Sequence, residues 1–237
     1  MALPKMQLPL YNVVIPSNKK QVKFRPFLVK EEKALLIAQQ SEDAKVMIDT
    51  LKSIINSCIE DTIDTESLAI FDYEYLFTQI RAKSVGEIVD LVFLCDDCTD
   101  EKAKAKISLD ITKFKVKFDE NHKNNIPLFG SVGIVMKYPG IETLQKLEKA
   151  GGGDVDSIFD VVADCVEYVY DGDEVFNVKE QTREEVLEFL NNLTQEQFNK
   201  IEEFFETMPK MSQPVQYDCP VCNKHHDKVM EGLNSFF

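Results

Sequence analysis

Three features of the sequence predict an α+β fold. Near the N-terminus, apolar and polar residues alternate on both sides of the turn sequence Pro16-Ser17-Asn18-Lys19, which is typical of a β-hairpin. Segments with helical periodicity follow, and two Cys-x-x-Cys motifs each lie where an alternating apolar run meets a polar turn. We therefore expect an N-terminal β-hairpin and helical bundle, a zinc-ribbon-like β unit formed by the two distant motifs, and an acidic helical region inserted between them.

The N-terminal part is expected to contain one hairpin and three helices. The hairpin strands are predicted at residues 8–15 and 21–29. A first helix follows at 30–40, and Ser41 is predicted to cap a second helix that reaches Cys58. Thr65 is predicted to cap a third helix at 66–83. Each helix has an apolar side, so we expect the three to pack as a bundle.

The two Cys-x-x-Cys motifs are the most specific signal in the chain. They read Cys95-Asp96-Asp97-Cys98 and Cys219-Pro220-Val221-Cys222. A two-residue spacer lets one short loop supply two thiolates, and two such loops complete a tetrahedral Zn²⁺ site. The sequence therefore predicts a structural zinc ion held by Cys95, Cys98, Cys219 and Cys222.

Each motif is expected at the tip of a β-hairpin. The first hairpin is predicted from residues 87–94 and 103–118, and the second from 215–217 and from residue 228 onward. Cys98 and Cys219 are 121 positions apart, which is far longer than in a contiguous zinc ribbon. The metal would therefore staple distant parts of the chain together.

Other uses of the cysteines are less well supported by the sequence. A disulfide framework is disfavoured because the chain shows no signal peptide, is rich in Lys and Glu, and suggests a reducing cytosol. Neither motif opens an amphipathic helix, as a thioredoxin-like redox motif would. Cys58 and Cys165 lie in helical apolar patterns and are expected to be buried. His225 and His226 follow the second motif, and either is an alternative ligand in place of a cysteine.

The charge distribution limits the classes of partner. The 237 residues have a formal net charge of −14, and 18 acidic residues face 5 basic ones between Glu142 and Met208. A nucleic-acid partner is disfavoured because it needs a positive footprint. The basic candidates are the lysines at 102, 104, 106, 113, 115, 117 and 123, whose alternation is better explained by a solvated strand face. No apolar stretch is long enough to cross a bilayer, so we expect an intracellular protein without a membrane partner.

The inserted region is expected to be mainly helical. A strand and a turn are predicted within 126–139, followed by a helix at 141–149, a flexible Gly151-Gly152-Gly153 break, and a helix from 155 to 170. A turn and a short strand at 174–178 come next, and the capping boxes of Thr182 and Thr194 predict two further helices that end near Leu190 and Met208. Four phenylalanines on these last helices, Phe189, Phe198, Phe204 and Phe205, are expected mostly in the core, and any exposed ones would form a docking patch.

These assignments divide the chain into four predicted parts. They are an N-terminal hairpin and bundle (1–86), a first zinc-knuckle hairpin (87–125), the acidic mainly helical region (126–210) and a second zinc-knuckle hairpin (211–237) that closes on the first.

An enzymatic function is disfavoured by the polar residues. The three histidines lie in polar loop sequence, and no nucleophile elbow, metalloprotease or nucleotide-binding pattern is found. A zinc hydrolase needs histidine or carboxylate ligands and an exchangeable water, whereas four cysteines fill the coordination sphere. We therefore expect no enzymatic activity.

Several strings resemble a known family. The segments 11–17 (Tyr-Asn-Val-Val-Ile-Pro-Ser), 22–33 and 75–87, together with one central and one terminal cysteine motif, resemble the baseplate hub protein family of T4-like bacteriophages, which includes or lies close to hub assembly factors. The resemblance spans most of the chain.

The resemblance implies a role in building the hub and central tail of a contractile phage. The implied partners are other tail and baseplate hub proteins, and the implied location is the host cytoplasm during assembly and the baseplate of the virion tail. Acidic helices bearing phenylalanines suggest an alternative, a transient chaperone of the helical tape-measure protein. A zinc-dependent hydrolase of the tail hub is the second alternative.

Overall fold

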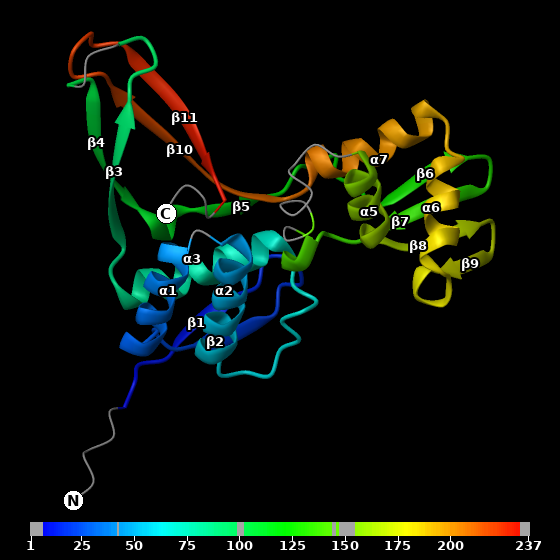
Figure 1. Ribbon diagram of the computed structural model, residues 1–237, viewed down its shortest axis with the longest axis horizontal. Coiled ribbons are helices and arrows are strands. Elements are labelled where there is room, and N and C mark those ends of the chain that lie inside the picture. The colour runs from blue at the N-terminus through cyan, green and yellow to red at the C-terminus, as the bar shows by residue number, and fades with distance from the viewer. Residues whose placement is uncertain (1–6, 42, 99–101, 144–145, 147–154, 233–237) are drawn as a thin grey trace, which may run out of the picture. The chain divides into compact units, whose positions relative to one another are not determined.

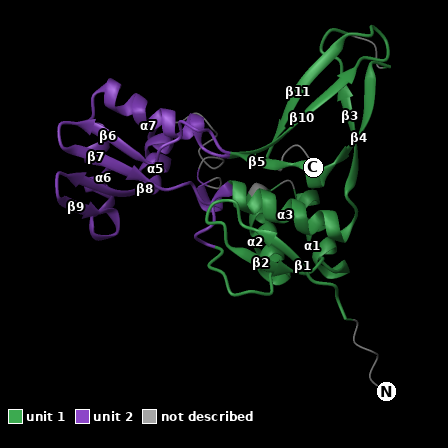
Figure 2. Ribbon diagram, turned by 180° about the vertical axis from the view of Figure 1, so that it is seen from behind, with its two compact units in different colours: residues 1–65, 71–117, 210–237 green, residues 66–70, 118–209 purple. Residues whose placement is uncertain are grey.

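The chain folds into two compact units. The computed structural model describes residues 7–41, 43–98, 102–143, 146 and 155–232. Unit 1 is formed by residues 1–65, 71–117 and 210–237, and unit 2 by residues 66–70 and 118–209 (Figure 2). The chain leaves unit 1 after Lys117 and returns at Lys210, so that most of unit 2 is one insertion. The fold is mixed α and β, as predicted.

The first half of unit 1 contains the predicted hairpin and three helices. Strands β1 (Tyr11–Val14) and β2 (Gln21–Phe24) are antiparallel, and α1 (Val29–Ser41), α2 (Ala44–Cys58) and α3 (Ile70–Ser84) follow (Figure 1). Each of these elements buries apolar side chains, among them Val13, Val22, Ala38, Ile55 and Leu76. The hairpin and the helices therefore share a core.

Two helix boundaries differ from the prediction. Ser41 ends α1, where its hydroxyl donates to the Ala38 carbonyl, and Asp43 caps α2 by accepting from the Lys45 and Val46 amides. A carboxylate so placed accepts from free N–H groups at a helix start. The third helix begins at Ile70 and not at 66.

The second half of unit 1 consists of two β-hairpins. Strands β3 (Ile88–Leu94) and β4 (Lys104–Asp110) form one, and β10 (Lys210–Asp218) and β11 (His225–Glu231) form the other. The predicted first hairpin was too long, because β4 ends at Asp110 and the residues of β5 (Lys115–Lys117) pair with β10 instead. A shared core joins the two hairpins, and its buried members are Ala82, Ile111, Phe114, Met211, Val215 and Met230.

Unit 2 is a four-stranded antiparallel sheet with helices. The strand order is β6 (Asn125–Phe129), β7 (Val132–Met136), β8 (Val166–Asp171) and β9 (Glu174–Asn177). Helices α5 (Val155–Cys165), α6 (Arg183–Asn191) and α7 (Gln195–Thr207) contribute to its core. The prediction of a helix through residue 170 is wrong, because the chain becomes strand β8 after Cys165. The region is therefore less helical than predicted.

Local signals in unit 2 were predicted correctly. Thr182 and Thr194 both form reciprocal capping boxes, with Glu185 and Gln197 respectively. Gly172, with a φ of 56°, stands at the first central position of the β8–β9 turn, as in a type II′ hairpin. The predicted Gly151-Gly152-Gly153 break lies outside the described residues, as does most of the helix predicted at 141–149.

The phenylalanines of α6 and α7 do not form an exposed patch. Phe204 is buried in the core of unit 2, and Phe189, Phe198 and Phe205 are partly buried and pack against it. The ring of Phe198 also stacks on Phe159 of α5, with 5.0 Å between centroids. Most of these side chains therefore stabilise the unit, as the sequence predicted.

Among the described residues, no helix is both long enough and apolar enough to span a bilayer.

A buried ion pair fixes the start of α1. An Arg25 guanidinium nitrogen lies 3.0 Å from Glu31 Oε1, and the Leu28 amide donates to Glu31 Oε2 at 2.8 Å. Burial by itself raises the pKa of the Glu31 carboxyl, but the hydrogen bonds from Arg25 and Leu28 outweigh it and hold the pKa below its ordinary value.

We expect Glu31→Gln to lower the free energy of unfolding at pH 7 by about 3 kcal/mol, because Arg25 would stay buried without its counter-charge. The folded pKa of Glu31 lies below the unfolded one, so this stabilisation is present above the unfolded pKa and is lost as the pH falls through the folded value. Urea unfolding at pH 7 and at about pH 3 measures both effects.

The matched control is Glu32→Gln, an exposed neighbour on the same helix, which should change the free energy of unfolding by less than about 0.5 kcal/mol. Equal effects of the two substitutions, or a Glu31 effect that does not shrink at low pH, would contradict this account of the pair.

Candidate metal centre

Both Cys-x-x-Cys motifs lie at hairpin tips. Cys95 follows the last residue of β3, and its amide donates to the Ala103 carbonyl at 3.1 Å. Cys219 follows the last residue of β10, and its amide donates to the Lys224 carbonyl at 2.9 Å. These bonds continue the strand pairing into the loops, so the first cysteine of each motif is held by the backbone.

The second motif forms a tight turn around its first sulfur. The Val221 amide donates to Cys219 Sγ at 3.4 Å, and the Asn223 amide donates to the Cys219 carbonyl at 2.9 Å. Asn223 has a φ of 57°, in the left-handed region that asparagine tolerates better than most residues. The turn therefore returns the chain to β11 while it directs backbone N–H groups toward a sulfur.

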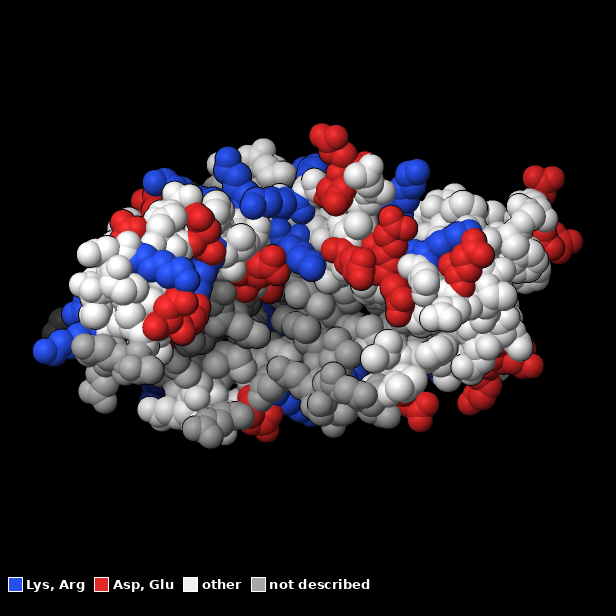
Figure 3. Space-filling model, turned by 90° about the horizontal axis from the view of Figure 1, so that it is seen from above, with Lys and Arg blue, Asp and Glu red and all other residues white. Residues whose placement is uncertain are grey.

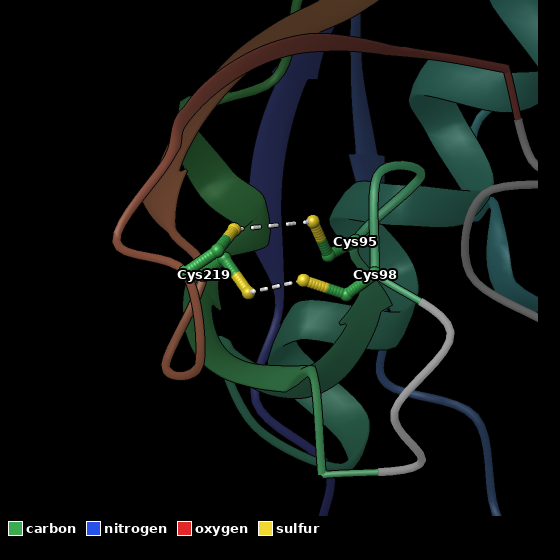
Figure 4. Close-up of side chains that lie close together, drawn as sticks. Cys95, Cys98 and Cys219 are labelled. Atoms are coloured by element: carbon green, nitrogen blue, oxygen red, sulfur yellow. Dashed lines mark hydrogen bonds between the residues drawn. The ribbon is translucent and has the colours of Figure 1, made fainter.

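The structure brings all four predicted sulfurs together. Cys95 Sγ lies 3.8 Å from Cys222 Sγ, and Cys98 Sγ lies 3.8 Å from Cys219 Sγ (Figure 4). All four lie within 4.8 Å of one another. In a regular tetrahedron with Zn–S bonds of about 2.3 Å, neighbouring sulfurs are about 3.8 Å apart. A disulfide needs about 2.05 Å, so the arrangement suits a metal ion and not a pair of disulfides.

Ion pairs hold the two tips together. Lys224 Nζ lies 2.7 Å from Asp97 Oδ2, and Lys228 Nζ lies 3.1 Å from Asp96 Oδ2. The two aspartates are the spacer residues of the first motif, and the two lysines follow the second. Exposed pairs of this kind contribute little stability singly, but they place positive charge beside a cluster of thiols.

Cys95, Cys98 and Cys219 differ in the pKa of their thiols. Backbone N–H groups of Cys222 and Val221 lower the pKa of Cys219 to about 7. The hydrogen bond with Cys222, together with burial, raises the pKa of Cys98, and burial raises that of Cys95. Without a cation, neighbouring sulfurs cannot all lose their protons easily, whereas a divalent cation would stabilise all four as thiolates.

His226 is a neighbour of the cluster that the sequence reasoning placed wrongly. It was predicted in a polar loop, but it lies buried on β11 with Nε2 at 3.3 Å from Cys95 Sγ. Its ring stacks on Tyr217, whose hydroxyl donates to the Leu94 carbonyl. The ligand atoms of Cys95, Asp97 and His226 also lie within 4.8 Å of one another, so His226 is a hydrogen-bond donor to Cys95 or an alternative ligand. The sequence signal for its burial was the spacing of His226 and Met230, which places both on the same face of a strand.

His225 and His122 do not join the cluster. His225 points to carboxylates, with Nδ1 at 2.7 Å from Asp218 Oδ1, and this contact raises its pKa. His122 belongs to unit 2, where it stacks on Tyr138 and its Nδ1 lies 3.0 Å from Thr207 Oγ1. His225 is thus the less suitable of the two adjacent histidines as a ligand.

The two remaining cysteines are buried, as predicted. Cys58 lies in α2 and Cys165 ends α5, and burial raises the pKa of their thiols to about 11 and about 12. They behave as small apolar residues and serve as controls for the cluster.

One known family matches nearly the whole chain. The family model described as T4 bacteriophage base plate protein matches residues 8–237. The chain belongs to this family. Separate comparisons with curated proteins and with solved structures found no match.

Membership defines the general role of this baseplate protein. The family is one of structural proteins of the phage baseplate, so its members are parts of the virion tail that contact other baseplate proteins. Such a family is usually non-enzymatic. The predicted resemblance to baseplate proteins of T4-like phages is confirmed.

We expect Cys98→Ser to reduce bound zinc from about one ion per chain to well below half, because three sulfurs leave the tetrahedral site incomplete. Inductively coupled plasma mass spectrometry of the purified protein measures the metal content. Cys58→Ala and Cys165→Ala remove cysteines outside the cluster and should leave the content unchanged.

Alanine at both His225 and His226 distinguishes the two ligand sets. With four cysteine ligands, the double variant keeps its zinc; loss of the metal would show that a histidine ligates it.

Proposed function

We propose that this chain is a non-enzymatic structural or assembly protein of a contractile phage tail. It acts in formation of the baseplate hub and central tail through protein–protein contacts, and Cys95, Cys98, Cys219 and Cys222 hold one structural zinc ion. Family membership supports the baseplate role. The single observation that supports the metal is the four-sulfur cluster, in which two sulfur–sulfur distances are 3.8 Å and all sulfurs lie within 4.8 Å of one another.

The position of the cluster explains why a metal would be needed. Strands β3 and β4 pair only with each other among the described strands, and an isolated two-stranded hairpin is marginally stable in water. At its base, the β3–β4 hairpin packs on the core that contains Phe114 and Met211. At its tip, its contacts with the other hairpin are mainly those with Tyr217 and those among the four cysteines. A metal at the tip would fasten the hairpin at its second end.

The chemistry of the donors favours zinc. Four thiolates in tetrahedral arrangement suit Zn²⁺ or an iron–sulfur centre, and soft sulfur donors disfavour Mg²⁺ and Ca²⁺. Sulfur spacings of 3.8 Å match a single ion. Structural zinc binding contributes on the order of 10 kcal/mol in small zinc domains, enough to keep the two tips joined.

The hydrolase alternative gains no support from this site. A catalytic zinc keeps an open position for water, and four sulfur ligands would leave none. The alternative set of Cys95, Asp97 and His226 shares Cys95 with the four-cysteine set, so the two sets compete for one ion.

One of the two observations behind the chaperone alternative is not met by the structure. It depended on acidic helices with accessible phenylalanines, but Phe189, Phe198, Phe204 and Phe205 belong to the core of unit 2 or pack against it. Only the acidity remains as support for holding a basic client such as the tape-measure protein. We therefore propose lasting contacts with hub proteins in the virion tail, after assembly in the host cytoplasm.

Phage carrying Cys98→Ser should assemble fewer complete tails than phage carrying Cys165→Ala, because the first variant loses a ligand of the proposed zinc site and the second keeps all four. Infectious titre and electron microscopy of lysates measure the difference. Quantitative mass spectrometry of purified wild-type virions should find the chain in fixed proportion to other baseplate proteins.

Two outcomes would contradict the proposal. Equal titres of the two variants would show that the metal cluster is dispensable for the tail. Virions that lack the chain, although assembly needs it, would show a transient assembly factor instead of a lasting component.

A further inference from the structure

The outer strand of the unit 2 sheet has an unprotected edge. Strand β9 ends the order β6-β7-β8-β9 and pairs only with β8 among the described strands (Figures 1 and 2). All four of its residues are exposed, including Val175 at 61% and Phe176 at 44%. Every second residue of such a strand directs its N–H and C=O groups away from its neighbour, so β9 offers free backbone donors and acceptors.

A second edge strand of the chain provides a contrast. Strand β5 also pairs on one side only, but Lys115 and Lys117 flank its single apolar residue, Val116. Lysines on an edge discourage pairing with other strands. Strand β9 has no lysine, proline or bulge, and its one charged residue is Glu174.

The sheet face beside β9 is aromatic and held in place. Tyr168 and Tyr170 of β8 lie opposite Asn177 and Val175 of β9, on the same face of the sheet. Tyr170 lies over Gly133, where a Cβ atom would come within 2.1 Å of its hydroxyl oxygen. That hydroxyl also donates to Asn125 Oδ1 at 2.8 Å. The ring therefore extends across β7 toward β6, and it leaves Val175 exposed on the β9 side of this face.

The surroundings of β9 are strongly acidic. Unit 2 has 21 acidic and 7 basic residues and so carries the whole net charge of −14, whereas unit 1 has 20 of each. Acidic side chains predominate at the right-hand end of the face in Figure 3. Three acidic residues lie in or next to β9 and have no ion-pair partner in the part of the chain that is described: Asp173, Glu174 and Glu180. A partner here must bring positive charge.

We propose that β9 accepts an extended basic segment of another baseplate protein as a fifth strand of the unit 2 sheet. Main-chain hydrogen bonds along β9 would supply affinity, as in other cases of strand addition. Apolar side chains of the segment would contact Val175 or Phe176, and its alternate Lys or Arg side chains would meet the carboxylates around β9. The inference rests on the proposed structural role and names the surface and the class of partner.

A second copy of the chain suits this edge less well. Two copies of unit 2 would each bring a charge of −14, so pairing of β9 with itself is opposed by repulsion. The chain has two alternating basic stretches of its own in the described residues. One begins β4, which already pairs with β3. The other is 113–118, where Phe114 is fully buried and the β5 residues already pair with β10, so it cannot present both apolar and basic side chains.

A peptide with the sequence of residues 113–118, Lys-Phe-Lys-Val-Lys-Phe, serves as the probe because it has the required alternation. We expect fluorescence polarisation to show saturable binding to the full chain that weakens as salt rises from about 50 to about 300 mM. Val175→Lys should weaken binding at least tenfold, since it gives β9 the protection that β5 has. Val155→Lys makes the same change at an exposed helical position of unit 2 and should have little effect.

Three results would overturn the inference: no saturable binding, equal weakening by both substitutions, or equal affinity for a peptide with Glu in place of each Lys. Size-exclusion chromatography provides a further test, because a dimer of the free chain that Val175→Lys abolishes would show a second copy at this edge instead. Zinc content measured on the same variants separates this inference from the proposed function, since Val175→Lys should keep its metal.

Discussion

The packing of two hairpin tips around four sulfurs is the constraint on which the rest of unit 1 depends. The hairpins lie on either side of an insertion of about ninety residues, so chain connectivity alone does little to hold the tips together. At their bases, Met211 and Phe114 share one core. At their tips, sulfurs from both hairpins come within 4.8 Å of one another, beside ion pairs and stacked rings that reinforce the same contact.

This arrangement separates two tasks within one chain. Unit 1 is electrically balanced and contains the proposed metal, whereas unit 2 carries the net charge and an unprotected sheet edge. A structural member of a large assembly needs both a stable body and surfaces that select neighbours. The insertion of unit 2 between the paired strands β5 and β10 links the two, because Lys117 and Lys210 face each other where the chain leaves and returns.

Local signals in the sequence were sufficient for much of the fold and for the four cysteines. The Cys-x-x-Cys spacing predicted the cluster, and the Thr182 and Thr194 capping boxes predicted two helix starts, because these signals act within a few residues. The errors arose where contacts between residues far apart in the sequence determine the local structure. Val166–Asp171 has apolar residues at helical spacing, but pairing with β7 makes it a strand, and its valines and tyrosines were the signal for that. Likewise, β5 belongs to β10 and not to the first hairpin, and His226 approaches Cys95 only through the folded register of β11.

Zinc K-edge X-ray absorption spectroscopy of the purified full chain tests the central claim most directly, because it reports both the metal and its donors. The account predicts one zinc ion with four sulfur neighbours at about 2.3 Å. A shell of nitrogen or oxygen donors at about 2.0–2.1 Å, or protein that folds and functions without bound zinc, would contradict it.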